Sequence, residues 1–419
     1  MQLKIDNLGM NGEGVAKHEG KTCFVDFCLP GEIVEAKIEK ENKNFCVCSC
    51  ENIVLPSKNR TLPFCKYFGK CGGCDIQHMN YESQLDFKKK LIEETFWKIC
   101  GEKVFVEKVF FSNDKNYRNK SVFALNECVV GMKKQNSNEI IEIENCPIAN
   151  DLTNKILKLF SGYIKNKSQA KNISHLAVRV VSNSAQIVVV SKSEIDIKDF
   201  STILSENNIN FGLFLNINKK QNVILSNDTR FICGEKYLKN EIFGIKFYLS
   251  PNSFYQVNDN VQKLLYEKVL GYIDSGSVVF DCYSGAGLMS AMLSTKAKFV
   301  HAIEIEKSSS LDAEKLKQQN NISNLQNHNG DISKVLPKII ERNACVVLDP
   351  PRSGCSEIVL ESIISSGAEK IVYVSCSPRT LARDYNILKK NYQIENCFGF
   401  DMFPNTKHVE TILYLSKKS

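Results

Sequence analysis

The sequence predicts an α/β protein in which a Rossmann-like C-terminal domain follows an OB-like β-barrel and a central α/β domain. Three observations support this fold class. Residues 1–58 contain short strand-like segments between glycines, residues 59–245 mix strand and helix patterns, and residues 246–419 repeat a strand, turn and helix order. At 419 residues the chain is also long enough for two or three domains of about 150 residues each.

The N-terminal part reads as a small β-barrel. Segments 24–27 and 33–38 are strand-like, and glycines recur between residues 9 and 31, where tight turns are needed. OB-like barrels commonly bind nucleic acid. The alternative is a barrel that only packs against the rest of the chain.

The central part begins with a cysteine-rich loop at residues 65–75. In residues 81–100 apolar side chains recur at helical spacing between lysines and glutamates, which predicts an amphipathic helix that lies on a neighbouring domain. Strand and helix patterns then alternate in the segments 121–125, 140–144, 152–163, 177–181 and 186–191. These segments predict a mixed α/β unit.

The C-terminal part contains apolar strands that end in polar or reactive residues. They are expected at residues 278–281, 300–304, 345–349 and 371–375. In an open parallel sheet the carboxyl ends of the strands line the ligand crevice. We therefore expect the chemistry of this protein to be concentrated at that edge.

The amino-acid composition limits where the protein can be located and which partners it can bind. The net charge of +7, from 54 basic and 47 acidic residues, permits a nucleic-acid partner without requiring one. No run approaches the roughly 18 to 20 apolar residues of a membrane helix, and Met1–Met10 lacks the apolar core of a signal peptide, so we expect a cytoplasmic protein that is not bound to membranes. There, 17 cysteines indicate reduced thiols, metal binding or catalysis rather than disulfides.

A glycine loop follows the first strand of the C-terminal part. The stretch 281–287, Asp-Cys-Tyr-Ser-Gly-Ala-Gly, lets the backbone near Gly285 approach a ligand closely, and Glu304 ends the next strand, where it can accept both ribose hydroxyls. A dinucleotide site would need a third glycine where Ser290 stands. The loop therefore favours S-adenosylmethionine. Asp331 is a candidate partner of the adenine amino group, with a plain turn residue as the alternative.

Three later motifs carry candidate reacting groups. Asp349 ends a strand and is followed by Pro-Pro-Arg, which stiffens the backbone and fixes where the carboxylate points. Cys376 ends the next strand, where a helix N-terminus and Arg379 are expected to favour its thiolate. Glu410 lies in the segment 407–416, which alternates like a strand; a solvated glutamate is the alternative interpretation.

Together these groups predict a reaction. Carbon C5 of a uracil ring is too weak a nucleophile until a thiolate adds at C6. We expect Cys376 to add at C6, C5 to receive a methyl group from S-adenosylmethionine, and Glu410 to remove the C5 proton. Asp349 would orient the uracil and Gln256 the cofactor. The sequence thus predicts an RNA pyrimidine methyltransferase.

Four cysteines form a second candidate site. Their spacing suits thiolate ligands of a soft metal, and zinc fits them about as well as iron. They are Cys65, Cys71, Cys74 and Cys146.

Over nearly its full length the chain resembles the uracil-5 RNA methyltransferases, in particular the branch with an N-terminal TRAM domain and an iron-sulfur cluster. The motifs that carry the resemblance are Pro30-Gly31-Glu32, Cys65-x5-Cys71-Gly-Gly-Cys74, Asn145-Cys146-Pro147, Phe254-Tyr255-Gln256-Val257-Asn258, Asp349-Pro-Pro-Arg, Ser375-Cys376-x-Pro and His408-Val409-Glu410-Thr411. The resemblance implies that Cys376 is the nucleophile and Glu410 the general base. It also implies a methyl-donor and uracil pocket formed by Gln256, Tyr283, Glu304 and Asp349, and a four-iron (4Fe-4S) cluster on Cys65, Cys71, Cys74 and Cys146.

The same branch modifies large-subunit ribosomal RNA, so the resemblance implies 23S ribosomal RNA as the partner. Relatives that act on transfer RNA generally lack both the barrel and the cysteine loop, but transfer RNA stays open as the alternative substrate. No obligate protein partner is evident, and we expect a monomer. Arg118 and Lys120 are expected to contact the RNA. The chain departs from the family pattern at Ser377, where asparagine is usual, and at Leu288, where many relatives carry a polar residue.

Three competing functions are less well supported. A cytosine-5 enzyme would carry Pro-Cys where this chain has Pro351-Arg352, and an amino-methyltransferase would carry Pro-Pro-Tyr there and need neither Cys376 nor Glu410. A non-catalytic iron-sulfur protein that binds RNA is the alternative from another class. All of the expected reacting groups are present, which disfavours it.

Overall fold

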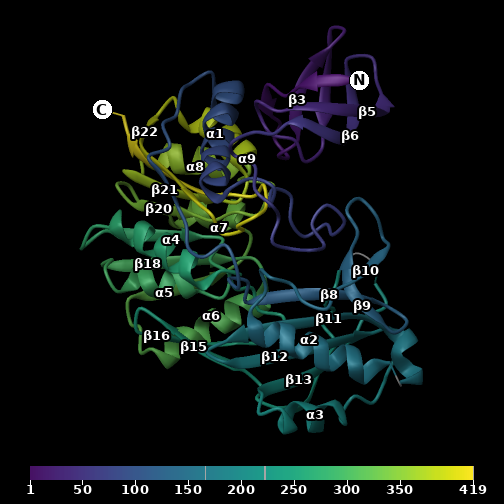
Figure 1. Cartoon of the computed structure of the whole chain (residues 1–419). Coiled ribbons are helices and arrows are strands. Elements are labelled where there is room, and N and C mark those ends of the chain that lie inside the picture. Colours follow the sequence, from purple (N-terminus) through teal and green to yellow (C-terminus); the bar gives the residue numbers. More distant parts are fainter. Residues whose placement is uncertain (166, 221–222, 419) are drawn as a thin grey trace.

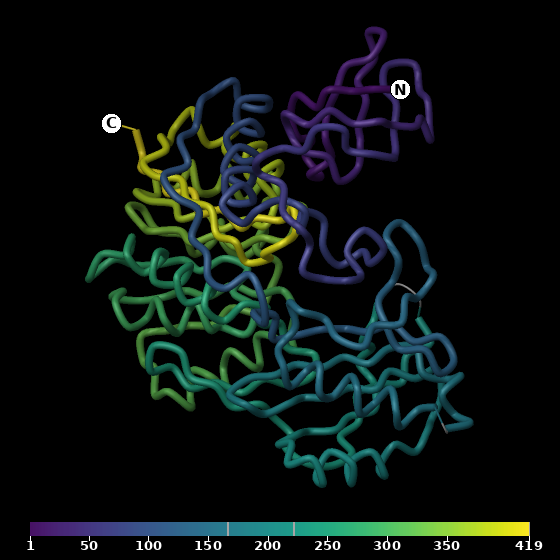
Figure 2. The backbone as a smooth tube through the Cα atoms, viewed as in Figure 1, coloured from purple at the N-terminus to yellow at the C-terminus, as the bar shows by residue number. Residues whose placement is uncertain are grey.

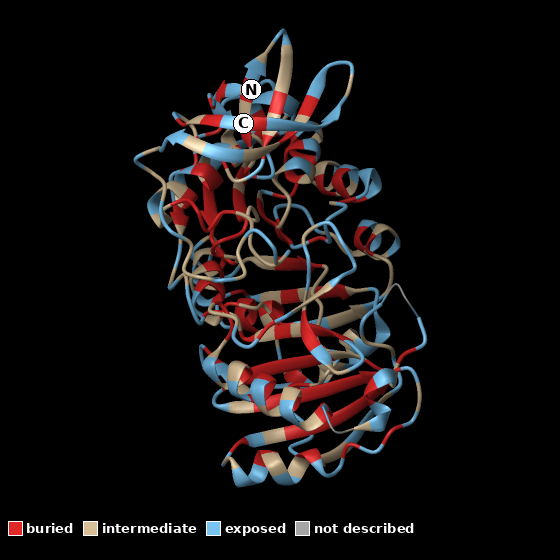
Figure 3. Cartoon of the chain, turned by 45° about the vertical axis from the view of Figure 1, so that its right-hand side comes forward, coloured by how far each residue is buried: buried red, intermediate tan, exposed pale blue. Residues whose placement is uncertain are grey.

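A computed structural model describes residues 1–165, 167–220 and 223–418 and shows three parts (Figures 1 and 2). The purple N-terminal barrel and the teal central sheet lie at opposite ends of the molecule, with the green and yellow C-terminal domain beside both. Buried residues, red in Figure 3, run through the strands of each part. No helix in these ranges is long and apolar enough to cross a membrane.

The N-terminal barrel is a six-stranded sheet in the order β1-β5-β6-β4-β3-β2. Cys23, Cys46 and Cys48 are buried in its core, where they act as small apolar side chains. The strand expected at 24–27 ends at Val25. Phe27 has φ 58°, a left-handed conformation that does not continue a strand. The strands are β1 (Gln2–Lys4), β2 (Asn7–Leu8), β3 (Gly14–His18), β4 (Lys21–Val25), β5 (Ile33–Glu41) and β6 (Phe45–Leu55).

The central domain is a seven-stranded sheet in the order β10-β9-β8-β11-β12-β13-β14, of which only the β12 and β13 pair is parallel. Helices α2 and α3 pack on one face, where they close an apolar core around Phe160 and Phe200. The elements are β8 (Lys120–Asn126), β9 (Val129–Lys133), β10 (Ile140–Glu142), α2 (Asp151–Ile164), η1 (Ser168–Asn172), β11 (Ile173–Val181), β12 (Ser184–Ser191), α3 (Phe200–Glu206), β13 (Asn210–Ile217) and β14 (Thr229–Gly234).

The C-terminal domain is an eight-stranded sheet in the order β19-β18-β17-β20-β21-β23-β22-β7. Strands β17 to β21 pair in parallel, while β23 runs antiparallel between β21 and β22. The elements are α4 (Asp259–Gly271), β17 (Val278–Cys282), α5 (Leu288–Ser294), β18 (Phe299–Glu304), α6 (Lys307–Gln319), β19 (Leu325–Asn329), α7 (Ile332–Ile339), β20 (Cys345–Leu348), α8 (Glu357–Ser366), β21 (Lys370–Ser375), α9 (Pro378–Leu388), β22 (Tyr392–Phe400) and β23 (Glu410–Lys417).

Two pieces of chain that begin before residue 246 complete this domain. Strand β7 (Lys108–Phe110) pairs in parallel with β22, and the hairpin of β15 (Leu238–Ile242) and β16 (Ile245–Leu249) packs its apolar side chains on α5 and α6. Neither was visible in the sequence, because both contacts join segments that are distant along the chain.

Helix α1 (Tyr81–Cys100) also lies on the C-terminal domain, against α9. It begins at Asn80, whose side chain accepts a hydrogen bond from the Ser83 amide at 2.9 Å, and it ends at Gly101 with φ 68°. Ile92 and Phe96 are fully buried in the core of the C-terminal domain. The apolar stripe read from the sequence is thus the packed face of the helix.

A buried ion pair fixes α1 to the loop after β22. Lys88 and Asp401 are both fully buried and bind each other, and Lys88 also donates to the Phe403 carbonyl at 3.0 Å. The Tyr81 hydroxyl donates to the second Asp401 oxygen at 2.9 Å. Each of the two charged groups therefore has a hydrogen-bonding partner in addition to the other, as buried charges require.

We expect Lys88→Met to lower the free energy of unfolding by about 3 to 5 kcal/mol, because it leaves the Asp401 carboxylate buried without its cation. Urea unfolding followed by circular dichroism would measure this. Lys90→Met, on an exposed position of the same helix, is the matched control and should change stability by less than about 0.5 kcal/mol. Equal stabilities of the two variants would contradict the structural role of the ion pair.

Candidate active site

Strand pairing brings the three predicted reacting groups to one edge of the C-terminal sheet. Ser375, the last residue of β21, lies opposite Thr411 in β23, so Cys376 and Glu410 follow as neighbours at the end of this ladder. Asp349 follows β20, the other neighbour of β21. The antiparallel insertion of β23 is what places Glu410 beside Cys376.

Glu410 is buried, with 5% of its surface exposed. Burial raises the pKa of its carboxyl to about 8, the negative charge of Asp349 acts in the same direction, and Arg352 opposes them. Asp349 lies among protein atoms but stays open to solvent on one side, and desolvation raises its pKa as well. The solvated alternative for Glu410 is therefore wrong.

Cys376 is half-buried and its thiol is not in a disulfide. Burial raises its pKa, with Glu410 and Asp349 acting in the same direction and Arg352 opposing. Desolvation and the two carboxylates therefore act against the resting thiolate that the sequence predicts. The cation that acts on the thiol is Arg352, whereas Arg379 is exposed on α9.

Ser377 is the N-cap of α9, and its hydroxyl accepts a hydrogen bond from the Thr380 amide at 3.3 Å. The Ser377 amide in turn donates to the Ser375 hydroxyl at 3.1 Å. Serine is a favoured N-cap residue. The departure from the family asparagine therefore preserves the start of the helix that follows the nucleophile.

The glycine loop between β17 and α5 has a left-handed backbone at Tyr283, Gly285 and Gly287, with φ of 67°, 56° and 80°. A Cβ atom at Gly287 would lie 2.7 Å from the Cβ of Ala313, so α6 passes too close for any side chain there. The Gly285 amide donates to Glu304 Oε2 at 2.9 Å. This bond holds the glycine loop against the end of β18.

Carboxyl groups cluster next to this loop. Asp281 is fully buried, and burial raises its pKa to about 7, with Asp349 and Glu304 acting in the same direction. Ser290, at the position that excludes a dinucleotide motif, donates its hydroxyl hydrogen to Asp281. The edge of the sheet therefore carries a negative potential that suits a cationic ligand.

Two further predicted cofactor residues have defined positions. Asp331 is the N-cap of α7 and accepts hydrogen bonds from the Ser333 amide and hydroxyl at 2.9 and 2.8 Å, which agrees with the turn alternative. Gln256 is half-buried, and its carbonyl accepts a bond from the Asn119 side chain at 2.9 Å. Asn119 also binds Asp259 at 2.8 Å and was missed, because the sequence marks it only as part of a basic cluster.

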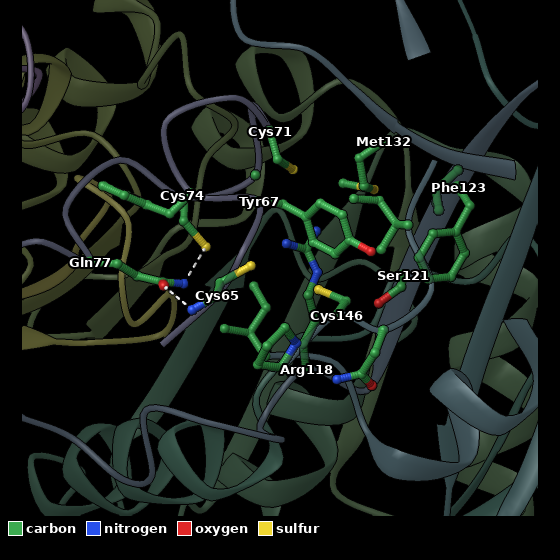
Figure 4. Close-up of a pocket in the computed structure, with 17 residues that line it drawn as sticks. Cys65, Tyr67, Cys71, Cys74, Gln77, Arg118, Ser121, Phe123, Met132 and Cys146 are labelled. Atoms are coloured by element: carbon green, nitrogen blue, oxygen red, sulfur yellow. Dashed lines mark hydrogen bonds between the residues drawn. The ribbon is translucent and has the colours of Figure 1, made fainter. Parts of the chain in front are cut away.

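Four cysteines line a separate cavity of about 90 Å³ between the cysteine loop and the central sheet (Figure 4). They are Cys65, Cys71, Cys74 and Cys146. Arg118 projects into the same space, and its charge opposes the rise that burial causes in the pKa values of Cys71 and Cys146. Burial raises the pKa of Cys74 to about 12, and the other three thiols add to this.

The sulfur atoms do not surround a point as metal ligands do. Within residues 1–165, 167–220 and 223–418, no group of three or more histidine, cysteine or acidic side chains is arranged to hold a metal ion. The cavity has room for several water molecules or a small inorganic group. The donor set thus fits a soft metal in composition, while its present geometry is that of free thiols.

The sequence matches the tRNA (uracil-5-)-methyltransferase family over residues 80–329 and 340–418. The chain belongs to this family. Residues 1–46 match the TRAM domain. Similar proteins include one named an RNA methyltransferase of Clostridium tetani, 35% identical over 99% of this chain and 95% of that protein, and one from Listeria innocua, 34% identical over 100% of this chain and 98% of that protein.

Among solved structures, the fold is similar to that of the Pyrococcus abyssi tRNA (uracil-54, C5)-methyltransferase in complex with S-adenosyl-L-homocysteine. The TM-score is 0.83 at 23% identity, over 99% of this chain and 100% of that chain. The protein is an S-adenosylmethionine-dependent RNA (uracil-5-)-methyltransferase. The predicted methyltransferase fold with an N-terminal TRAM domain is confirmed.

The residues at the sheet edge fit S-adenosylmethionine. This cofactor carries a sulfonium and an ammonium group, and Asp281, Glu304 and Asp349 supply negative charge beside the open glycine loop. A bound cation would stabilise the ionised carboxylates. Leu288, the family departure, begins α5 and packs with the apolar cluster of the β15 and β16 hairpin.

A basic groove of about 1560 Å³ extends from the central sheet to Arg352 and His408 of the C-terminal domain. Among the described residues its only acidic lining side chain is Asp75, whereas its lysines and arginines are Arg118, Lys133, Lys134, Lys192, Lys219, Lys220, Arg352 and Lys407. This charge suits an RNA backbone. Of the two expected RNA contacts, Arg118 lines the groove and Lys120 does not; burial lowers the pKa of Lys120 to about 8.

We expect the double variant Lys133→Glu and Lys192→Glu to weaken RNA binding. The salt dependence of the affinity should fall by roughly one unit of log-log slope for each phosphate that is no longer neutralised. Fluorescence anisotropy with single-stranded RNA at several salt concentrations would measure both. Lys103→Glu with Lys338→Glu makes the same charge change on exposed positions outside the groove. If the two double variants lose equal affinity, the groove is not the RNA path.

Proposed function

We propose that this enzyme transfers a methyl group from S-adenosylmethionine to C5 of a uridine in 23S ribosomal RNA through a covalent adduct between Cys376 and C6. The observation that carries the proposal is the ladder of β21 and β23, which ends with Cys376 and Glu410 side by side. Asp349 and the glycine loop lie at the same edge. No amino-methyltransferase chemistry would need this pairing.

The proposed cycle uses each group once. The Cys376 thiol first loses its proton to solvent, and Arg352 stabilises the thiolate. The sulfur then bonds to C6, and the electrons of the C5=C6 double bond move toward C5 and O4. S-adenosylmethionine, when bound, would supply the electrophilic methyl group that C5 receives and leave as S-adenosylhomocysteine. The Glu410 carboxylate then takes the C5 proton, the C5–H electrons restore the C5=C6 double bond, and the C6–S bond breaks to return the thiolate.

The pKa of Glu410 supports its role as the base. A general base works best when its pKa is near the working pH, because it then binds a proton strongly and is still partly unprotonated. An exposed glutamate, with a pKa of about 4.3, would be a weaker base for the C5 proton. Burial beside Asp349 raises the pKa of Glu410 to about 8, which is the direction that this task requires.

The RNA class is the finer part of the proposal. The cysteine cavity and the TRAM domain favour ribosomal RNA through the family resemblance. However, the Pyrococcus abyssi enzyme, which is named for a transfer RNA substrate, overlaps 99% of this chain. The N-terminal barrel therefore does not by itself separate the two RNA classes, and transfer RNA is the alternative that an experiment must include.

The test uses the full chain, S-adenosylmethionine and unmodified ribosomal or transfer RNA that carries tritium at uridine C5. We expect tritium release and methyl incorporation with ribosomal RNA, neither with Cys376→Ala, and a methylated protein–RNA adduct that resists denaturant with Glu410→Gln, because the last proton cannot leave. Cys233→Ala, in the central domain, is the matched cysteine control. Methyl incorporation without tritium release would overturn the mechanism, and release from transfer RNA alone would overturn the substrate class.

We expect single-turnover tritium release to rise from pH 6 to pH 9, because Glu410 acts only when unprotonated and its pKa is raised to about 8. The pKa of Cys376 is raised too, so adduct formation also accelerates with pH. The adduct rate of Glu410→Gln isolates the cysteine contribution. A release rate in the wild type that does not change over this range would contradict Glu410 as the base.

We also propose that Cys65, Cys71, Cys74 and Cys146 ligate a 4Fe-4S cluster. The shared cavity, the four soft donors and the charge of Arg118 support it. The cluster would hold the cysteine loop on the central sheet, and no step of methyl transfer is assigned to it.

Anaerobically purified protein should contain about four iron and four sulfide per chain and show a broad absorption near 400 nm, which Cys74→Ser should abolish. Cys128→Ser, a half-buried cysteine outside the cavity, is the control. About one zinc per chain without sulfide would replace the cluster by a zinc site. Loss of iron from both variants alike would reject these ligands.

A further inference from the structure

The loop that leads to Glu410 is held by distant parts of the chain. Phe400 pairs with Glu410 across the β22 and β23 hairpin, so residues 401–409 form its connecting loop. Most of this loop is buried. Lys88 and Tyr81 bind its first residue, Asp401, and the Tyr117 hydroxyl donates to the Pro404 carbonyl at 3.1 Å.

Asn405 lies at the centre of these contacts. It is fully buried and has φ 67°, a left-handed conformation that asparagine tolerates better than most residues. Its amide donates to Gln84 Oε1 at 3.0 Å and its side-chain Oδ1 accepts from Gln84 Nε2 at 3.3 Å. Its Nδ2 donates to the Asp114 carbonyl at 2.8 Å. One residue thus joins the loop to α1 and to the segment after β7.

The carbonyl of Asn405 connects the same loop to the cysteine loop. It accepts hydrogen bonds from the amides of Asp75 and Ile76 at 3.0 and 3.1 Å, immediately after Cys74. The Asp75 carboxylate then accepts a bond from the Lys407 amide at 3.2 Å. Residues 406–408, which lead to Val409 and Glu410, therefore follow directly after a residue that hydrogen bonds hold in place.

We propose that Asn405 is a positioning residue for proton removal: it fastens residues 401–409 to α1 and to the cysteine loop and so holds Glu410 at the C5 proton. This inference rests on the proposed function, in which Glu410 is the base. Cys376 follows β21, which is also held by its parallel pairing with β20, away from this loop. A loosened loop should therefore spare the formation of the adduct and slow its breakdown.

The test uses Asn405→Gly in the full-length enzyme with C5-tritiated ribosomal RNA. Glycine keeps the left-handed backbone and the main-chain bonds but removes the side-chain bonds to Gln84 and Asp114. We expect adduct formation at the wild-type rate, accumulation of the methylated adduct, and tritium release slowed by roughly 10- to 100-fold, because small misplacements of a reacting group cost about that much. Affinity for S-adenosylhomocysteine should not change.

A second variant tests the same link from the other side. Gln84→Met on α1 removes both side-chain bonds to Asn405, with Asp86→Asn, exposed on the same helix, as its control. It should reproduce the slow breakdown and decides the matter alone if Asn405→Gly does not fold. The inference would be overturned if the variants formed and broke down the adduct more slowly to the same extent. It would also be overturned if both variants turned over at the wild-type rate. A wild type that forms no Cys376-dependent adduct would instead overturn the proposed function.

Discussion

Desolvation at the carboxyl edge of the C-terminal sheet is the constraint on which the rest of the site depends. Asp281 and Glu410 are buried there, Asp349 stays open to solvent on one side, and the pKa of each is raised. For Glu410 the shift from 4.5 to about 8 corresponds to a cost on the order of 5 kcal/mol for ionising the carboxyl. This shift keeps Glu410 partly protonated near neutral pH and makes its carboxylate a stronger base than that of an exposed glutamate.

The same constraint explains how charge is distributed over the molecule. Acidic groups lie at the inner edge beside the glycine loop, where their charge suits a cationic cofactor. Basic groups line the outer groove, where their charge suits RNA phosphates. Arg352 belongs to both regions, because it lines the groove and lowers the pKa values of Cys376 and Glu410. The positive charge of Arg352 therefore acts both on the basic groove and on the proposed reacting groups.

The sequence predicted the parts of the site that local pattern determines. Strands that end in Asp349 and Cys376 can be read from apolar runs followed by reactive residues, and the loop at Gly285 and Gly287 from its glycines. It did not predict which cation faces Cys376, because Arg379 is close to the cysteine in sequence and only the fold brings the more distant Arg352 to the thiol. The hydrogen bonds of Asn119 join two domains and leave no local signal in the sequence. The lysines of the groove come from separate segments, and only the fold brings them to one surface.

The order of the chain makes these domains mutually dependent. Helix α1 and strand β7 precede the central domain in sequence, but they pack on the C-terminal sheet, where β7 covers the outer edge of β22. An uncovered edge strand exposes unpaired backbone groups, so the catalytic sheet is complete only when this earlier segment has joined it. Because the cysteine loop lies just before α1 and contacts the loop before Glu410, the position of Glu410 depends on contacts from more than one domain.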